Sequence, residues 1–216
     1  MKYISIKTLS ISIGIVLVIG LIIIYLINRT GLPNLSNKEL LDKFNKNPSY
    51  DISLDNQSAS IKGSYSTPKS FQGDYYTKAK GTQTDKPDYK IVVVDDKKQI
   101  IDSQDKAIDN PNFLLIETNI ISHPEYINVL EPVSREVADN ITYIKYNVIF
   151  EKTDPDINKS VPPDIHSDLV YRGYILVNEK TKILKKLVLS QKSNPSEITI
   201  DYTALNKKVE INLPAN

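Results

Sequence analysis

The chain has two histidines, and neither lies in a sequence pattern that indicates catalysis or metal binding. His166 lies in the segment Asp164–Asp168, beside Ser167 and between two acids. A Ser-His-Asp triad depends on geometry rather than adjacency, and the strained nucleophile turn G-x-S-x-G is missing. Zinc sites place a second ligand three to five residues from a histidine, which neither His123 nor His166 has. We therefore predict no catalytic and no metal site, and a solvated loop around His166.

Two further features that could carry chemistry are incomplete. Asp154, Asp156 and Asn158 resemble the acids of a calcium loop, but the central Gly and the terminal Glu are missing and Pro155 interrupts the spacing. The chain has no cysteine, which excludes thiolate metal sites, disulfides and cysteine nucleophiles. The glycines are spread singly, so no phosphate-cradling loop is indicated. The sequence therefore predicts a protein that is not an enzyme and needs no cofactor.

The charge balance excludes one class of partner. The whole chain has a formal net charge of +1 at pH 7. Without Lys2, Lys7 and Arg29, the remainder is slightly acidic. Nucleic-acid binding depends on cationic side chains that neutralise phosphates, so we predict no nucleic-acid partner.

A run without charged residues and apolar except at Ser12, Ile11–Ile27, lies near the N-terminus. With the three residues before it, the run reaches the ~20 residues that a helix needs to cross a hydrocarbon core of ~30 Å. A cleavable signal has a shorter apolar core, about 7–15 residues, followed by small residues, and no alanine precedes Ala59 here. We therefore predict a transmembrane signal anchor at residues 8–27, with a cleaved signal peptide as the alternative.

The charged flanks of this segment do not decide its orientation. Lys2, Lys7 and the terminal amine precede it, while Arg29, Lys38, Lys43 and Lys46 follow it, so the positive-inside count is not decisive. A very short N-terminal tail ahead of a long domain usually stays in the cytoplasm. We expect residues 1–7 in the cytoplasm and the C-terminal domain outside a cell membrane that the chain crosses once.

Residues 28–49 are predicted to be a linker and a short juxtamembrane helix. Ser36 and Glu39 have the spacing of a capping box, and Leu40, Leu41 and Phe44 lie on one helical side. These signals predict a helix over Asn37–Asn45. About 185 residues follow the anchor, enough for one domain with a real core, which we place at residues 50–216.

From Tyr50 onwards, apolar and polar residues alternate with period two, which is typical of antiparallel strands with one buried face. We expect strands near Ala59–Tyr65 and Phe71–Ala79, and a hairpin formed by Tyr89–Val94 and Gln99–Asp102. The last third predicts further strands at Ile144–Phe150, Leu169–Val177, Ile183–Leu189, Ile198–Tyr202 and Val209–Leu213.

The middle of the chain has helical signals instead. Asn110 and Pro111 form a good N-cap and first-turn pair, and apolar residues follow at spacings of three and four, which predicts a helix over Pro111–Ser122. A second short helix is expected within Glu125–Ala138. Strands with segregated helices predict an α+β fold.

Two C-terminal stretches resemble a known family. Glu197–Pro214 is similar to the last hairpin of the LolA-like lipoprotein carrier superfamily, where a strand closing in an aromatic, a turn with Asn or Gly and a strand finishing in Pro recur. Tyr174–Leu189 looks like the family's paired strands around an Asp/Asn-x-x-Thr turn. The order of elements over Tyr50–Pro214 also matches, and the resemblance is closest to the lipid-binding branch of the LppX and LprG type.

The resemblance implies a half-open antiparallel β-barrel whose concave face is covered by helices and holds acyl chains, here preceded by one transmembrane helix. Members of the superfamily carry lipids or lipoproteins, and others sense envelope stress. This chain lacks the lipidated cysteine of the lipid-binding branch and has an apolar anchor in its place. A tethered domain cannot ferry cargo freely across a wide gap.

A curved sheet facing a helix would enclose an apolar interior, which small residues on the strands would leave open. Those small residues are Ala59, Gly63, Gly73, Ala79 and Gly173. The residues that we expect to contact a lipid are Phe113, Ile116, Ile120, Tyr146, Val148 and Phe150. The alternative is a dry, packed core in which the glycines mark bulges or twist.

Two functions are therefore compatible with the sequence. The first is a membrane-tethered, extracytoplasmic protein that binds a lipid or lipoprotein by holding acyl chains in an apolar cavity. The alternative is an envelope sensor or scaffold domain that has no ligand cavity and binds a protein partner, for which the loop Lys152–Asp168 is the predicted contact.

Overall fold

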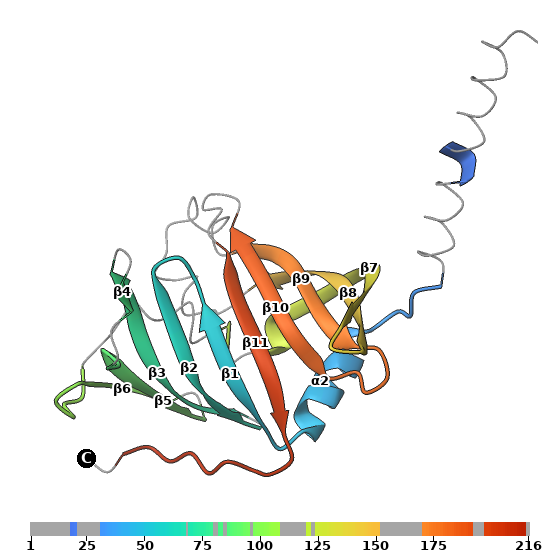
Figure 1. Cartoon of the computed structure of the whole chain (residues 1–216). Helices are drawn as coiled ribbons and strands as arrows, with labels where there is room; N and C mark the ends of the chain where they lie inside the picture. Colours follow the sequence, from blue (N-terminus) through green and yellow to red (C-terminus); the bar gives the residue numbers. More distant parts are fainter. Residues whose placement is uncertain are drawn as a thin grey trace, which may run out of the picture.

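In a computed structural model of the chain, one large antiparallel sheet organises the domain (Figure 1). The structure describes residues 18–20, 31–67, 69–79, 82–83, 86–95, 97–108, 120–121, 124–151, 170–191 and 197–214. The strands lie in the order β6-β5-β3-β2-β1-β11-β10-β9-β8-β7, and β4 pairs with β3 outside this path. Their bounds are β1 Ser49–Asp55, β2 Ala59–Ser66, β3 Ser70–Ala79, β4 Thr82–Gln83, β5 Tyr89–Val94, β6 Lys97–Asp102, β7 Ile127–Ala138, β8 Ile141–Glu151, β9 Val170–Asn178, β10 Leu184–Gln191 and β11 Ile198–Leu205.

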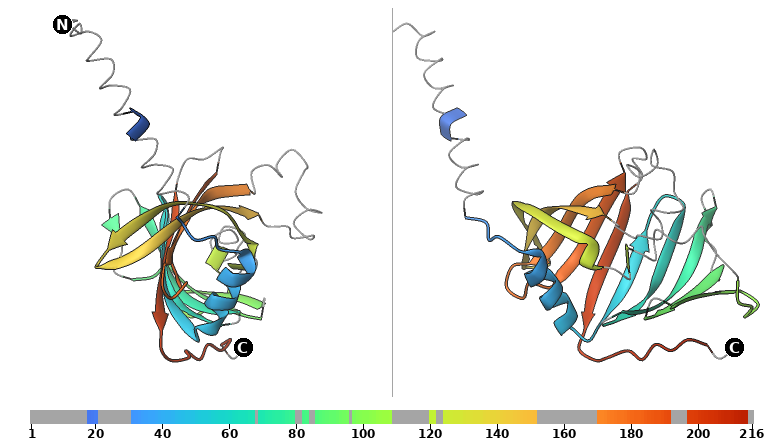
Figure 2. Two further views of the ribbon diagram at one scale, coloured as in Figure 1. Left: turned by 90° about the vertical axis from the view of Figure 1, so that its right-hand side faces the viewer. Right: turned by 180° about the vertical axis from the view of Figure 1, so that it is seen from behind.

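The sheet is curved and not closed, since β6 and β7 are its edges among the described strands. Figure 2 shows the curvature, with the helix α2 (Asn37–Lys46) inside the curve. Buried aliphatic and aromatic side chains from the strands and from α2 form one hydrophobic core cluster. The predicted antiparallel, half-open architecture is therefore confirmed at the level of an open, curved antiparallel sheet with few helices.

Helix α2 begins where the capping box predicts. Ser36 is the N-cap, and its Oγ accepts a hydrogen bond from the backbone N–H of Glu39 at 3.1 Å. Leu40 and Phe44 are buried, and the Phe44 ring stacks on Tyr50 with 4.5 Å between the ring centroids. The predicted juxtamembrane helix is therefore packed into the core of the domain.

In the register of the paired strands, five directly opposed residues, one from each of five strands, form a row across the sheet. Tyr202 on β11 lies opposite Ile52 on β1, which lies opposite Gly63 on β2. The row continues through Gly73 on β3 to Ile91 on β5. Directly opposed residues share one face of a sheet. The buried members of this row show that it lies on the face that carries the core.

The expectation of a second short helix within Glu125–Ala138 is wrong. A single 3₁₀ turn, η2 (Pro124–Tyr126), is followed by the long strand β7, whose partner among the described strands is β8. Pro132 is tolerated because an edge strand does not need every N–H for its ladder, and the register shifts on both sides of this residue. In β7, the pairing with β8 and the β-branched residues favour a strand more than the helical spacing of the apolar residues favours a helix.

The predicted strand Val209–Leu213 is also wrong, and with it the last hairpin that the family resemblance used. β11 already pairs with β1 on one side and with β10 on the other, so it has no free edge for a further strand. Residues 206–214 instead leave the sheet and run below the ends of β1, β2 and β3 (Figure 1). Ile211 is buried, and the Ser49 hydroxyl donates a hydrogen bond to the Lys207 carbonyl oxygen.

Several predictions concern residues outside the described ranges. The apolar run is described only at residues 18–20, which are helical, and the predicted helix Pro111–Ser122 only at Ile120 and Ile121. The loop Lys152–Asp168 lies entirely outside. Within the part of the chain that the structure describes, no helix is both long and apolar enough to span a membrane.

Candidate functional site

Four of the six residues predicted to contact a lipid are described, and all four lie in the hydrophobic core. Tyr146, Val148 and Phe150 alternate along β8 on the concave face, and Ile120 joins the same cluster. None of the four is more than 2% exposed. The other two, Phe113 and Ile116, lie outside the described residues.

Tyr146 connects the core to the segment by which the chain enters the domain. Its hydroxyl donates a hydrogen bond to the carbonyl oxygen of Pro33 at 2.8 Å. Burial, followed by the negative charges of Glu39 and Glu179, raises the pKa of Tyr146 to about 12. The phenol is therefore neutral at physiological pH, and its role in the structure is to hold the entering chain.

Phe150 is enclosed by other aromatic rings. Tyr126 and Tyr171 approach it edge-on, with 6.0 and 6.4 Å between the ring centroids. Edge-to-face pairs at such separations add to the stability of a core. On the described part of β8, the predicted lipid contacts are thus packed against protein side chains.

The strand glycines do not leave open space on the sheet. A Cβ on Gly63 would lie 2.1 Å from the carbonyl oxygen of Gln72, and one on Gly173 would lie 1.8 Å from that of Val188. A Cβ on Gly73 would come within 2.5 Å of the Phe71 ring. These residues therefore permit close approach between strands, as the packed-core alternative expects. Ala59 is buried, and the side chain of Ala79 is outside the described part.

An aromatic cluster that sequence reasoning missed lies between α2 and the sheet. The Phe44 ring is 5.5 Å from Tyr65 and 5.8 Å from Tyr202, in addition to its stacking on Tyr50. The Tyr50 hydroxyl donates a hydrogen bond to the Phe44 carbonyl oxygen at 3.0 Å, whereas the buried Tyr202 hydroxyl has no hydrogen-bond partner among the described residues. Burial raises the pKa values of Tyr50, Tyr65 and Tyr202, so all three phenols are neutral.

A pocket of about 540 Å³ lies at the β5–β6 end of the sheet. It is formed where the chain enters β5 and leaves β6, and it is lined by Lys86, Pro87, Asp88, Tyr89, Asp102, Ser103 and Ile108. Tyr89 and Ile108 pack against the hydrophobic core, so the apolar part of the pocket is continuous with it. The volume falls within the ~300–1,000 Å³ that is usual for small-molecule sites.

The acids of this pocket are held in place by backbone donors. An Asp88 carboxylate oxygen accepts a hydrogen bond from the Thr77 N–H at 2.7 Å. Asp102 accepts from the N–H groups of Lys106 and Gln104, at 2.9 and 2.8 Å, and these bonds lower the pKa of Asp102. The pocket therefore combines polar groups held in place, Asp88 and Asp102, with apolar contacts from Tyr89 and Ile108.

The sequence contained only weak signals for this pocket. Tyr89 and Asp102 are the two ends of the predicted hairpin, and the other lining residues lie just outside it, where no element was predicted. The ring of Tyr89 lies 5.9 Å from that of Tyr75, and the two residues face each other across the β3–β5 ladder. Ile108 is brought beside them by a hydrogen bond from its N–H to the Ile100 carbonyl oxygen at 2.8 Å. This return of the chain after β6 was not predicted.

Metal chemistry has no candidate among the residues that the structure describes, where no group of three His, Asp or Glu side chains is placed to hold an ion. Both histidines, and the acids Asp154 and Asp156, lie outside the described ranges.

No family model matches the chain, and no curated protein matches it. Solved structures that are similar over most of its length include the following three. Lipoprotein LppX from Mycobacterium tuberculosis is 12% identical, with 81% of this chain and 95% of that chain covered and a TM-score of 0.49. LprF from Mycobacterium bovis is 12% identical, with 83% and 97% covered and a TM-score of 0.49.

A LolA superfamily protein from Nitrosomonas europaea is 10% identical, with 84% of this chain and 96% of that chain covered and a TM-score of 0.34. The solved structures to which the chain is similar thus include LppX and a LolA superfamily protein.

Proposed function

We propose that the chain is a membrane-tethered, extracytoplasmic protein that binds an acylated lipid or lipoprotein, with an acyl chain against the apolar wall of a pocket in its curved sheet. The observation that carries the proposal is the pocket at the β5–β6 end, with its volume of about 540 Å³. Tyr89 and Ile108 would contact the acyl chain, while Asp102 and Ser103 would face the polar head. The apolar run at residues 8–27 is the proposed tether.

The energetics favour a ligand that has both an acyl tail and a polar head. Burying an acyl chain contributes about 0.8 kcal/mol per CH₂ relative to water. A lipid that comes from a bilayer has already left water, so its tail gains little by transfer. The contacts of the head with the polar groups of the pocket then decide which lipids are bound. A tethered protein could take up and release such a ligand only at its own membrane.

The residues predicted from the sequence remain a separate expectation. Tyr146, Val148 and Phe150 lie on β8, several strands away from the pocket, and pack against protein side chains. With Phe113, Ile116 and Ile120 they stay the lipid contacts that the sequence predicts. The pocket and the β8 face can be tested separately, because no residue belongs to both.

The experiment measures binding of a fluorescent long-chain fatty acid to the full chain in detergent. Ser103→Trp places an indole in the pocket, and Gln104→Trp places the same indole on the next residue of the turn, which does not line the pocket. We expect wild type and Gln104→Trp to bind alike and Ser103→Trp to bind at least about tenfold more weakly, a difference of 1.4 kcal/mol. Native mass spectrometry of wild type should show co-purified acyl ligand.

The packed β8 face is the observation that favours the alternative function, a sensor or scaffold domain without a ligand cavity. Under that alternative, the full chain is recovered free of acyl ligand and binds no fluorescent fatty acid. Equal binding by the two tryptophan variants would also exclude the pocket as the site. Deleting Lys152–Asp168 would then abolish binding of a protein partner.

A further inference from the structure

The hairpin of β7 and β8 exposes apolar side chains. Among the described residues of the domain, the large hydrophobic side chains that are exposed all lie on it: Val137 at 72%, Leu130 at 50%, Val133 at 42% and Ile141 at 39%. Asp139 and Asn140 have φ values of 52° and 59° and form the tight turn at its tip. Ala138 and Ile141 flank this turn, and Val137 comes one residue earlier on the other face of the hairpin, so the tip is apolar on both faces.

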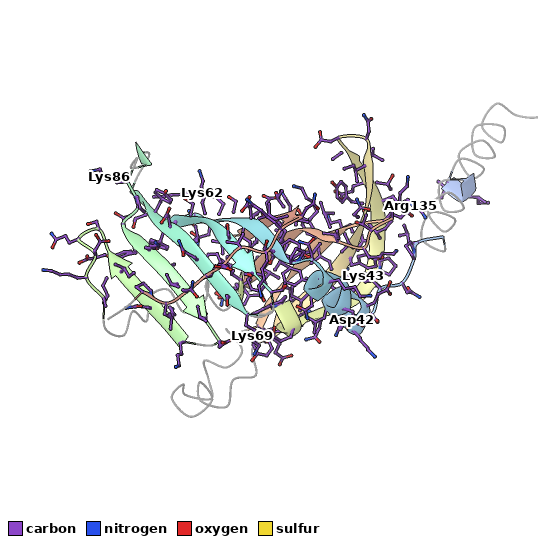
Figure 3. All side chains as sticks on the ribbon, turned by 90° about the horizontal axis from the view of Figure 1, so that it is seen from below. Asp42, Lys43, Lys62, Lys69, Lys86 and Arg135 are labelled. Carbon is purple, nitrogen blue, oxygen red and sulfur yellow. The ribbon has the colours of Figure 1, made fainter. Side chains whose placement is uncertain are left out.

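The chain enters the domain beside this hairpin. The Arg135 guanidinium donates a hydrogen bond to the carbonyl oxygen of Gly31 at 3.0 Å, and Tyr146 donates to that of Pro33. Leu32 and Leu35 are buried in the core. The stretch predicted as a linker is therefore fixed to β7 and β8 from Gly31 onwards. Figure 3 shows Arg135 on the hairpin next to this entering segment.

The fixed entry limits how far the hairpin can lie from the end of the apolar run. Gly31 follows Ile27 by four residues, which span at most about 14 Å when extended. Arg135 contacts Gly31, and Val137 lies two residues further along β7, on the same face of the strand. A bilayer that contains the run up to Ile27 must therefore lie within reach of the hairpin tip.

We infer that the tip of the β7–β8 hairpin docks on the surface of the membrane that holds the N-terminal run. This inference rests on the tethering part of the proposed function. Val137 and Ile141 insert among the lipid head groups, as exposed apolar side chains do at an interface. The contact fixes the orientation of the domain, so that the curved sheet is held at a set angle to its membrane.

A second copy of the chain fits this surface less well. Strand-to-strand pairing at β7 would need a regular row of free backbone groups. Pro132 has no N–H, and the ladder is irregular on both sides of it. At the start of the strand, the Asn37 side chain already accepts a hydrogen bond from the Val129 N–H at 2.6 Å. Apolar side chains on an irregular edge suit a lipid surface better.

The hairpin and its neighbouring turn carry no excess of basic residues, so the docking is apolar rather than electrostatic. On β7, β8, the turn between them and the β9–β10 turn lie four basic residues, Arg135, Lys145, Lys180 and Lys182, and five acidic residues, Glu131, Glu136, Asp139, Glu151 and Glu179. Attraction to anionic lipid needs an excess of basic residues. We therefore expect docking on vesicles of neutral phosphatidylcholine alone.

The absence of tryptophan from the chain allows a direct test. The full chain is reconstituted in phosphatidylcholine vesicles with a single tryptophan at Val137, and its emission is compared between ordinary lipid and lipid brominated near the head-group end of the acyl chains. Lys97→Trp, on the distant β5–β6 hairpin, is the matched control. Ile22→Trp, inside the apolar run, reports the tether itself.

We expect bromine to quench Val137→Trp and Ile22→Trp strongly and Lys97→Trp hardly at all, with the same pattern when phosphatidylglycerol is added. Quenching of Ile22→Trp without quenching of Val137→Trp would overturn the docking and leave the tether intact. Quenching of neither would overturn the tether, and the docking with it. If the Val137→Trp indole becomes protected from bromine quenching only as the protein concentration rises, the surface binds a second copy of the chain instead.

Discussion

Gly63 on β2 lies directly opposite Gly73 on β3, and a Cβ built on Gly63 would stand only 2.4 Å from the Gly73 Cα. The two bare backbones approach each other on the concave face, in the row that joins Tyr202 to Ile91. Glycine at such positions marks a close approach between strands. The bend of the sheet in this half of the domain thus depends on the absence of side chains at both positions.

Gly63→Ala should destabilise the domain strongly. The new methyl group would meet the Gln72 carbonyl oxygen at 2.1 Å, a backbone atom that cannot rotate away. Overpacking of this kind costs about 1–3 kcal/mol, and the rigid neighbour places the expected loss at the upper end. Urea unfolding of the full chain in detergent measures it. Lys62→Ala, an exposed neighbour on the same strand, is the control and should change the unfolding free energy little.

The two tyrosines beside Phe44 should respond oppositely to loss of their hydroxyls. Tyr202→Phe removes a buried hydroxyl without a partner among the described residues, so the free energy of unfolding should rise by about 1 kcal/mol. Tyr50→Phe removes a hydrogen bond to the Phe44 carbonyl oxygen and should lower it by about 1 kcal/mol. Urea unfolding of both variants decides this, and equal losses would show that the Tyr202 hydroxyl has a favourable contact.

Asn37→Ala should loosen the contact between α2 and β7. The Asn37 side chain accepts a hydrogen bond from the Val129 N–H and donates one to the Asn128 side chain at 3.0 Å. Because both bonds are exposed, we expect a loss of about 1 kcal/mol in global stability. The Val129 amide should exchange with solvent faster. Lys38→Ala, the next residue on the helix, should leave that amide protected, and unchanged exchange in Asn37→Ala would contradict the contact.

Local sequence patterns predicted most of the helices and strands. The wrong assignments concern segments whose structure depends on which strand, if any, lies beside them. The capping box at Ser36 and the alternation in β2, β3 and β8 depend on neighbours in sequence, so they could be recognised directly. Val209–Leu213 alternates equally well but has no strand to pair with, because β1 and β10 occupy both sides of β11. β7 was assigned wrongly because an edge strand that contains a proline lacks a clean period of two.

The candidate sites depended on contacts that the sequence does not display. Phe44 meets Tyr202 across 158 residues, and nothing in either segment indicates the other. The pocket needs Ile108 to return beside Tyr89 after β6 has ended. The predicted lipid contacts on β8 do lie on the buried face of the strand. Burial alone, however, does not tell whether such a residue contacts a ligand or another side chain of the protein.

Alkaline pH should destabilise the domain partly through Tyr146. Burial raises the pKa of this phenol from its ordinary value of 10.0 to about 12 in the folded chain. Below the unfolded value both states are protonated, and the stabilising contribution of the neutral, hydrogen-bonded phenol is complete. As the pH rises from 10 towards 12, the unfolded chain loses its proton first, so the free energy of unfolding falls with pH.

Tyr146→Phe should be less stable than wild type at neutral pH, because it loses the hydrogen bond to the Pro33 carbonyl oxygen. This deficit in the free energy of unfolding should shrink above pH 10. Urea unfolding of both proteins at a series of pH values measures the difference, and a deficit that stays constant with pH would show that Tyr146 ionises equally easily in both states.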